Sequence, residues 1–320
     1  MGAVEVHITA RHTDMHAELP TDLKMPNEAY AWRHVIYILG SVYALLFISY
    51  LICAKTEHPW IVALFVPFLG AQIYKITIIM HDCCHYTLFR RRAVNARVGT
   101  ICGWFVGADF KNFSRLHWKH HARYGEKDDP QGADYLYLEG ASRWHILWHI
   151  VRPIFGYNLF KLFQFGKAAA DHPTQQPHSK KSSWANALSF LAGVGAIQIS
   201  LAATATGLFE IWWLVLLYPV SAGTFALFFS QTRGFAEHVA DPGQSPIHHA
   251  RTHVPNLFDR LFFYTLNFNY HIEHHQHPSI PSCHLPRIHQ EMRARADYGE
   301  VSNGILQTVM RRWGYRRGEQ

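Results

Sequence analysis

Histidines recur in three short clusters whose spacing is typical of metal ligands. The clusters read HDCCH, HWKHH and HIEHH. Their imidazoles belong to His81 and His85, to His117, His120 and His121, and to His271, His274 and His275. On a helix, residues four apart differ by about 40° in direction, so each cluster converges on one side. Neutral imidazole is a common metal ligand, and each cluster therefore predicts a set of converging ligands.

The number of ligands indicates more than one ion. The three clusters offer eight ring nitrogens, whereas a transition-metal ion takes about four to six ligands. Two ions can use all eight. A solvated polar helix face also explains one such cluster, but it does not explain three clusters that reach the same side of a membrane.

Four apolar segments are long enough to cross a bilayer, which takes about 20 residues. They are Val35–Ala54, Pro59–Met80, Trp184–Thr206 and Phe209–Gln231. Buried helices of a soluble core are the alternative. The segments carry no charge except Lys75 and, near the start of the fourth segment, Glu210, and Trp and Tyr lie at their ends, as in membrane spans.

Short turns join the segments in pairs, at Lys55–His58 and Gly207–Leu208. Each pair is therefore expected to form a hairpin, and the Lys and Arg distribution places the long connections in the cytosol. We expect an all-α integral membrane protein with four transmembrane helices in two hairpins. Residues 1–33 form a cytosolic tail, and residues 34–320 form a multi-pass membrane domain whose histidine-rich cytosolic cap comprises 81–183 and 232–320.

Two further apolar stretches are not expected to span. Val98–Ala108 is too short and contains three glycines, so it is a candidate re-entrant or interfacial piece. Trp144–Phe165 mixes aromatic and basic residues around Pro153 and predicts an interfacial amphipathic helix. Its His145 and His149 are spaced like ligands, but a polar stripe facing lipid headgroups explains them better.

Composition argues against several other classes of protein. Histidine occurs 24 times and charged residues make up 17% of the chain, below the roughly 25% of soluble domains. The net charge of +7 lies around the apolar segments, which suits a membrane surface rather than nucleic acid. The five cysteines form no C-x-x-C pair, so a disulfide framework is not expected.

A metal transporter or sensor is the alternative outside enzymes. Transporters place ionisable ligands near the bilayer midplane. The four apolar segments contain no histidine, which favours a metal site beside the bilayer.

At the three clusters the sequence resembles the membrane fatty-acid desaturase superfamily. The family pattern is H-x-x-x-H followed by two H-x-x-H-H boxes, with hairpins between them. "DDPQGADY" after the second box and "NYHIEHHQHPSIPSCHLPRIH" around the third are similar to family contexts. The resemblance covers most of the chain after the tail and is specific for the family rather than for one substrate.

The resemblance implies two Fe ions, which imidazole ligands alone do not, because they also suit Zn and Cu. It also implies O2 as co-substrate and oxidation of an unactivated C–H bond. Electrons would come from a separate soluble carrier, such as a ferredoxin, a rubredoxin or a small b-type cytochrome. The eight box histidines are the predicted catalytic and metal-binding residues.

Additional site residues follow from the same resemblance and from neighbouring positions. His238 resembles a ninth ligand, and Asn267 is a candidate to hold a metal-bound water. Asp82, Asp134 and Glu273 are candidates to orient ligand imidazoles, which usually need a hydrogen-bond partner. The other C-terminal histidines are expected at the surface or behind the ligands; they are His248, His249, His253, His277, His284 and His289.

The expected reaction is desaturation of a lipid-linked or carrier-linked fatty acyl chain. The chain would reach the metals from the bilayer through an apolar channel lined by the second and fourth spans and Val98–Ala108. Family members also include hydroxylases and ketolases that act on lipids or carotenoids, and these remain the alternative among enzymes.

Overall fold

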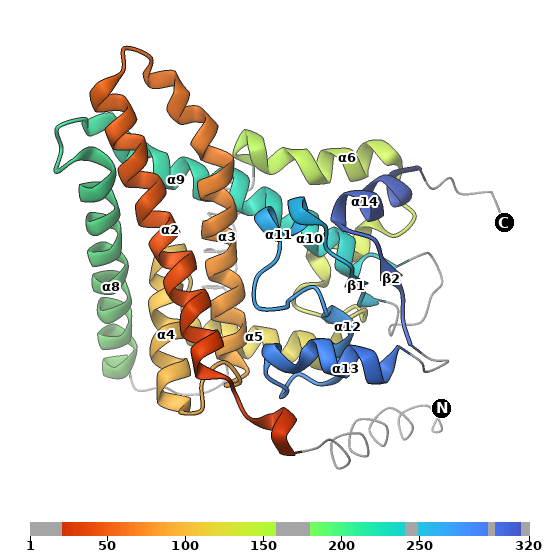
Figure 1. Ribbon diagram of the computed structural model, residues 1–320. Helices are drawn as coiled ribbons and strands as arrows, with labels where there is room; N and C mark the ends of the chain where they lie inside the picture. Colours follow the sequence, from red (N-terminus) through yellow and green to blue (C-terminus); the bar gives the residue numbers. More distant parts are fainter. Residues whose placement is uncertain (1–20, 158–179, 241–248, 294–297, 315–320) are drawn as a thin grey trace.

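The computed structural model describes residues 21–157, 180–240, 249–293 and 298–314, and in these residues the chain is mostly helical (Figure 1). The one sheet in this part of the chain pairs β1, Thr252–His253, with β2, Val301–Ser302, in parallel. This short pairing ties the segment before the third histidine cluster to the C-terminal region.

Four helical segments are long and apolar enough to cross a membrane. They are Asp22–Lys55, Pro59–Cys84, Trp184–Thr206 and Trp212–His238. The prediction of four apolar spans is confirmed in length and composition, although each of the second and fourth helices runs on past its predicted end. The extensions, to Cys84 and to His238, place the predicted ligands His81 and His238 beyond the apolar stretches.

The first two spans lie side by side (Figure 1). α2, Glu28–Lys55, begins at Asn27, whose side chain accepts a hydrogen bond from the Tyr30 backbone N–H. Its buried residues recur at intervals of three or four, as expected of one packed helix face: Ala31, Val35, Ile38, Val42, Leu46 and Ser49. The second span consists of the 3₁₀ turn η2, Pro59–Leu64, and of α3, Phe65–Cys84.

The fourth span is irregular. It follows α8, Lys180–Thr206, and is made of η6, Trp212–Leu216, α9, Leu217–Ser221, a π-helical turn at Ala222–Ala226, and α10, Leu227–His238. The π turn packs against α3 at Gly70. Any side chain at position 70 would overlap Phe225 of the π turn. Such turns redirect helices, and α10 leaves α9 to run toward the C-terminal helices (Figure 1).

The region after the second span forms two helices, α4, Arg92–Val106, and α5, Phe110–Arg123. The expected short piece Val98–Ala108 is thus the second half of a 15-residue helix that is still too short to span. Gly107 ends α4 with φ +69°, a left-handed conformation that glycine adopts without strain. The Phe110 ring packs directly on Gly99, so α5 folds back against α4.

The remaining helices are short. They are α6, Arg143–Val151, α11, Leu257–Phe262, α12, His271–Gln276, α13, Leu285–Met292, and α14, Ile305–Gly314. The predicted helix Trp144–Phe165 corresponds to α6 and to the 3₁₀ turn η5, Arg152–Phe155, and its end lies outside the described residues. α6 and η5 expose Trp144, Trp148 and Phe155.

Candidate metal centre

Nine histidines from distant parts of the sequence converge in the interior. They are the eight of the three clusters and His238, and each is at most 9% exposed. The end of α3 carries the first pair, α5 the second cluster, the end of α10 carries His238, and α12 the third cluster. The helical spacing explains the convergence, because ligands on a single helix lie on its buried face.

α5 shows how the sequence aims its ligands. Asp109 caps the helix by accepting a hydrogen bond from the Asn112 backbone N–H at 2.7 Å. His117, His120 and His121 are buried, while the intervening Trp118 and Lys119 are exposed. The helix therefore turns its imidazoles inward and its basic residues outward.

A first group of five imidazoles lies at the junction of α3, α5 and α12. Its ring nitrogens all lie within 4.8 Å of one another, and they belong to His81, His85, His117, His121 and His274. Successive Nε2 atoms are 3.0 Å apart for His85 and His117, 2.9 Å for His117 and His121, and 3.1 Å for His121 and His274.

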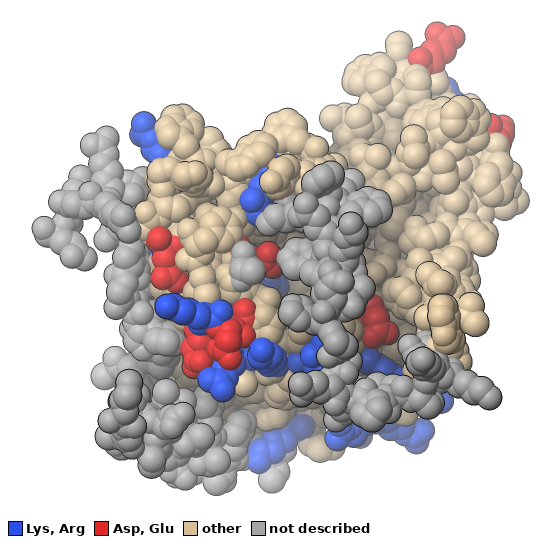
Figure 2. Space-filling model, turned by 180° about the vertical axis from the view of Figure 1, so that it is seen from behind, with Lys and Arg blue, Asp and Glu red and all other residues tan. Residues whose placement is uncertain are grey.

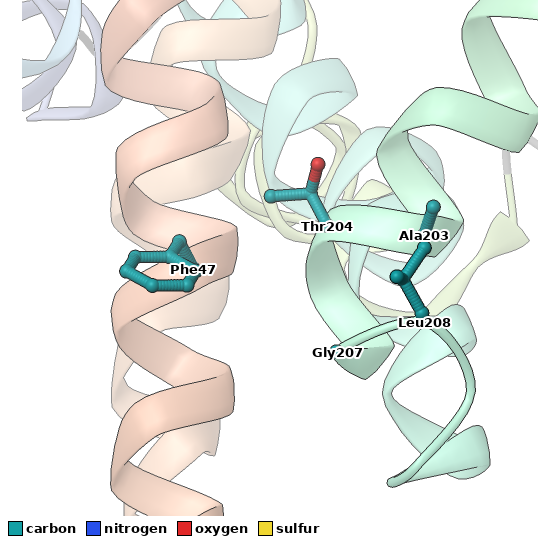
Figure 3. Close-up of a pocket in the computed structure, with 5 residues that line it drawn as sticks. All are labelled: Phe47, Ala203, Thr204, Gly207 and Leu208. Carbon is teal, nitrogen blue, oxygen red and sulfur yellow. The ribbon is translucent and has the colours of Figure 1, made fainter.

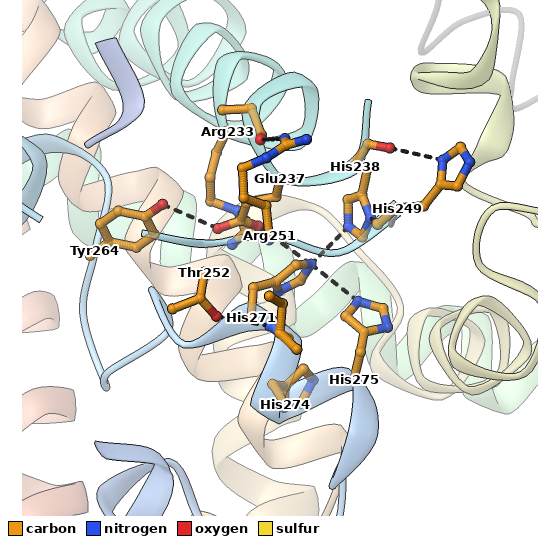
Figure 4. Close-up of polar contacts among 12 residues, drawn as sticks. Arg233, Glu237, His238, His249, Arg251, Thr252, Tyr264, His271, His274 and His275 are labelled. Carbon is orange, nitrogen blue, oxygen red and sulfur yellow. Dashed lines mark hydrogen bonds and ion pairs between the residues drawn. The ribbon is translucent and has the colours of Figure 1, made fainter. Parts of the chain in front are cut away.

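A second group lies beside the first, where α10 meets α12 (Figure 4). The Nε2 atom of His271 is 2.9 Å from that of His238 and 3.1 Å from that of His275. The His120 ring lies 5.0 Å from the rings of both His238 and His275. The carboxylate of Glu237 approaches the same place, with Oε2 3.5 Å from the His271 Nε2.

These spacings fit bound metal ions. Two nitrogens that each bind an ion at about 2.1 Å, at right angles to one another, lie about 3.0 Å apart. Unprotonated nitrogens facing each other at this distance repel, so a cation between them is the arrangement that stabilises the group. The first group provides five nitrogens and the second provides four, which suits two ions rather than one.

Burial keeps these imidazoles neutral, as ligands must be. It lowers the pKa of His85 to about 3, with a further contribution from His120. Burial likewise lowers the pKa of His271, His274 and His275 well below the usual value, and neighbouring imidazoles add to the effect.

Three ligand imidazoles have partners that fix their orientation. Asp129 accepts from His120 Nδ1 at 2.9 Å, and Tyr135 donates to the same carboxylate at 2.5 Å. The His249 backbone carbonyl accepts from His238 Nδ1 at 2.7 Å, and Asp82 lies 3.2 Å from His81 Nδ1. Each contact leaves the Nε2 atom facing its group, which is the role that carboxylate and carbonyl partners have in histidine–metal sites.

Sequence reasoning found Asp82 but missed Asp129, although Asp129 lies in the quoted DDPQGADY segment. The sequence feature that could have identified Asp129 is an acidic residue about two helical turns beyond His120, at the point where the chain turns back after α5. His249 was expected at the surface or behind the ligands, and it is buried against His238.

The other residues predicted to support the ligands have different contacts. Glu273 is buried but accepts from Thr252 and Tyr298 and pairs with His289, none of which is among the nine imidazoles. Asn267 has φ +56°, and its side chain donates to the Ser282 carbonyl at 3.1 Å. The side chain of Asp134 and residue His248 lie outside the described part of the structure.

A buried charged network adjoins the second group (Figure 4). Arg233 forms an ion pair with Glu237 at 2.7 Å, and the Tyr264 hydroxyl donates to the same carboxylate at 3.3 Å. The ion pair offsets part of the cost of burying both charges. This network was not anticipated from the sequence, which pointed only to His238 in this segment.

A cavity of about 420 Å³ opens elsewhere, between α2 and the end of α8 (Figure 3). Its lining consists of Phe47, Ala203, Thr204, Gly207 and Leu208. None of the nine histidines lines it, so this cavity is separate from the metal centre. The expected channel between the second and fourth spans stays a prediction.

Apolar helices of membrane-spanning length beside a buried, histidine-rich centre define a membrane metalloprotein class. Comparison with known proteins identifies the family: residues 57–302 match the fatty acid desaturase family. The chain therefore belongs to the fatty acid desaturase family, as the histidine clusters predicted, and it is a membrane oxidoreductase of lipid metabolism.

Three curated relatives illustrate the range of this similarity. The chain is 24% identical over 298 residues to a sphingolipid delta(4)-desaturase/C4-monooxygenase of Rattus norvegicus, and 26% identical over 293 residues to that of Bos taurus. Each alignment covers 88% of this chain and 80% of the relative. An sn-1 oleoyl-lipid 12-desaturase of a Picosynechococcus strain is 31% identical over 134 residues, covering 41% of this chain and 36% of the relative.

Proposed function

We propose that the protein desaturates a long acyl chain of a membrane lipid or carrier-bound acyl group at a di-iron centre. The observation that carries the proposal is the division of nine buried imidazoles into two groups with ligand-like spacing. Family membership supports iron over zinc, because zinc has no redox chemistry.

The ligands of the two irons follow from the two groups. One ion would be held by His81, His85, His117, His121 and His274, and the other by His120, His238, His271 and His275. Glu237 lies close enough to the second group to offer an oxygen ligand. We keep Asn267 as a candidate for holding a water molecule between the protein and an ion.

Bound iron would supply reductive activation of O2. For a –CH2–CH2– unit the balance is O2 + 2 e⁻ + 2 H⁺ + –CH2–CH2– → –CH=CH– + 2 H2O. The two electrons would come from a separate soluble carrier, a ferredoxin, a rubredoxin or a small b-type cytochrome. The protein's own part is to hold both ions close together and to exclude water, which the burial of every ligand favours.

The membrane arrangement is part of the proposal. The helices would form two hairpins, with the metal centre on the cytosolic face and both termini in the cytosol. The short connections at Lys55–His58 and Gly207–Leu208 would face the opposite side. An acyl chain would then approach the irons laterally from the bilayer without crossing water.

Hydroxylation is a second candidate function, because the two mammalian relatives are each named as both a desaturase and a monooxygenase. Both reactions begin with removal of a hydrogen from an unactivated C–H bond. They differ in whether a second hydrogen leaves or oxygen is inserted. The same centre is therefore compatible with either outcome.

Lipid mass spectrometry under ¹⁸O2 distinguishes the two reactions. The chain is expressed in a host with a matching electron carrier, beside a control carrying His274→Ala. Desaturation predicts lipids lighter by two hydrogens and free of ¹⁸O at the oxidised position. Incorporated ¹⁸O would replace the desaturase proposal by the hydroxylase or ketolase alternative, and an unchanged lipid profile would contradict both.

A further inference from the structure

Trp118 connects the metal centre to the protein surface. Its side chain is 41% exposed, yet its ring lies 4.8 Å from the His85 ring and 6.1 Å from the His121 ring. Its indole N–H donates to the Cys84 carbonyl at 3.2 Å, which fixes the ring in this position. A fixed aromatic ring thus spans from the outside of α5 to two imidazoles of the first group.

Three cations line the outer face of α5 beside this ring. Lys111, Arg115 and Lys119 recur every four residues, so they form one stripe, and all three are exposed. No carboxylate among the described residues lies within ion-pair distance of any of them; Arg115 only donates to Asn112. On the helical wheel Trp118 lies between this stripe and His121.

The charge pattern continues around α5. Figure 2 shows Lys and Arg side chains along the lower part of the face seen from behind, with the largest cluster of acidic side chains at the left end of this row. Arg123 at the end of α5 pairs with Glu126 and lies near Asp128, so its charge is partly compensated. The uncompensated charge is concentrated on the Lys111–Lys119 stripe.

We propose that this α5 face, made of Lys111, Arg115, Lys119 and Trp118, is the docking surface for an acidic one-electron carrier protein, with Trp118 at the point of electron entry. The inference rests on the proposed function, which requires two electrons per turnover. Each docking event oxidises one reduced carrier and passes one electron inward past His85. Two events, with two protons and one O2, complete one desaturation.

An acidic protein fits this surface better than a bilayer does. A helix that lies on a membrane exposes an apolar stripe, as α6 and η5 do with Trp144, Trp148 and Phe155. In contrast, Trp118 is the only large apolar side chain exposed on α5. Complementary charge mainly accelerates association, and this effect weakens as salt is added.

The test measures oxidation of a reduced, acidic plant-type ferredoxin by the iron-loaded full chain in lipid nanodiscs. The triple variant Lys111→Glu, Arg115→Glu, Lys119→Glu should lower the second-order rate constant at least about tenfold at low salt. Its iron content and its single turnover with dithionite should match the wild type. The control reverses three exposed arginines elsewhere, Arg143→Glu, Arg287→Glu and Arg293→Glu, and should keep the wild-type rate.

Trp118→Leu separates docking from electron entry. We expect a lower electron-transfer rate at saturating ferredoxin, an unchanged apparent KM for ferredoxin and unchanged iron content. Wild-type rates in both the triple variant and Trp118→Leu would overturn the proposal. The proposal would also be overturned if the triple variant lost its binding to vesicles containing anionic lipid but kept the wild-type rate with ferredoxin. Failure of the wild type with dithionite as well as ferredoxin would instead contradict the proposed function.

Discussion

At the scale of single residues, the chemistry depends on burying nine imidazoles without charging them. Desolvation of an imidazolium is costly, and it keeps the ring nitrogens of residues such as His85 available to a metal at neutral pH. The same packing brings the nitrogens to about 3 Å from one another, a spacing too short for a water molecule to lie between them. Removing a single ring therefore alters an entire group rather than one isolated contact.

His274→Ala tests the first group directly, because His274 lies 3.1 Å from His121 and joins α12 to α5. We expect turnover to be lost and bound iron to fall from about two ions per chain to one or fewer. Elemental analysis of the purified protein measures this. His145→Ala, which removes an exposed histidine on α6, should retain both the iron and the activity. Normal turnover in His274→Ala would refute the ligand assignment.

Asp129→Asn tests the orienting contact with His120. An amide can donate as well as accept, so the His120 tautomer that presents Nε2 to the metal is no longer enforced. Losses of such partners typically reduce metal affinity or activity about 10–100-fold, and we expect the same here by competition with a chelator. The neighbouring Asp128→Asn changes an exposed carboxylate, and equal losses in both variants would argue against an orienting role.

At the scale of secondary structure elements, α3 supports α11 through an unusual buried charge. Lys75 is 3% exposed, and its Nζ donates to the carbonyls of Arg260 at 3.0 Å and Leu261 at 2.7 Å, in the last turn of α11. These carbonyls have no partner within their own helix. The lysine therefore fixes the segment that precedes α12 against the second span.

Lys75→Met should lower the free energy of unfolding by about 1–3 kcal/mol, because buried carbonyls lose their donors. Thermal unfolding in detergent measures the effect. Lys75→Arg should retain part of the stability because it keeps a donor at this position. Lys55→Met, at the exposed end of α2, should have no measurable effect, and a Lys75→Met protein as stable as wild type would exclude the proposed support.

The C-terminal elements are joined by Glu300. Burial alone would raise its pKa, but the ion pairs with Arg251 at 2.9 Å and with Arg312 outweigh this and lower the pKa from 4.5 to about 2. A lowered carboxyl pKa stabilises the folded state above pH 4.5, and the contribution disappears as the pH falls toward 2.

Glu300→Gln should therefore be less stable than the wild type at pH 6, and the difference in melting temperature should shrink as the pH falls from 4.5 toward 2. Thermal melts at several pH values in one detergent provide the comparison. Glu291→Gln removes an exposed carboxylate of α13 and should show no such trend. A difference independent of pH would mean that packing, not charge, explains the effect of Glu300.

At the scale of the whole molecule, the proposed topology makes a labelling prediction. A single cysteine introduced at Glu57 or Leu208 should react with an impermeant maleimide from outside intact cells, whereas one at Asp128 should react only after lysis. Leu208 is 77% exposed, and it is preferred to Gly207, where a side chain would overlap the Tyr50 ring. External labelling at Asp128 would invert the proposed orientation.

The sequence alone predicted the four apolar spans and the histidines that we propose as ligands, because both depend on local periodicity. Apolar runs of about 20 residues specify spans, and H-x-x-H-H specifies an imidazole face wherever the segment is helical. His238 was also predicted, though only by resemblance. These features need no knowledge of which segments meet.

Only the tertiary structure decided how those histidines are grouped. The sequence gives no reason for His120 to leave its neighbours His117 and His121 and join His238 and His275. That division depends on the crossing of α5, α10 and α12, and on Asp129 holding His120 from outside the helix. Contacts between residues so far apart in the chain arise from packing, which local periodicity does not encode. For the same reason, the roles of Lys75, Glu237 and Trp118 became visible only in the folded chain.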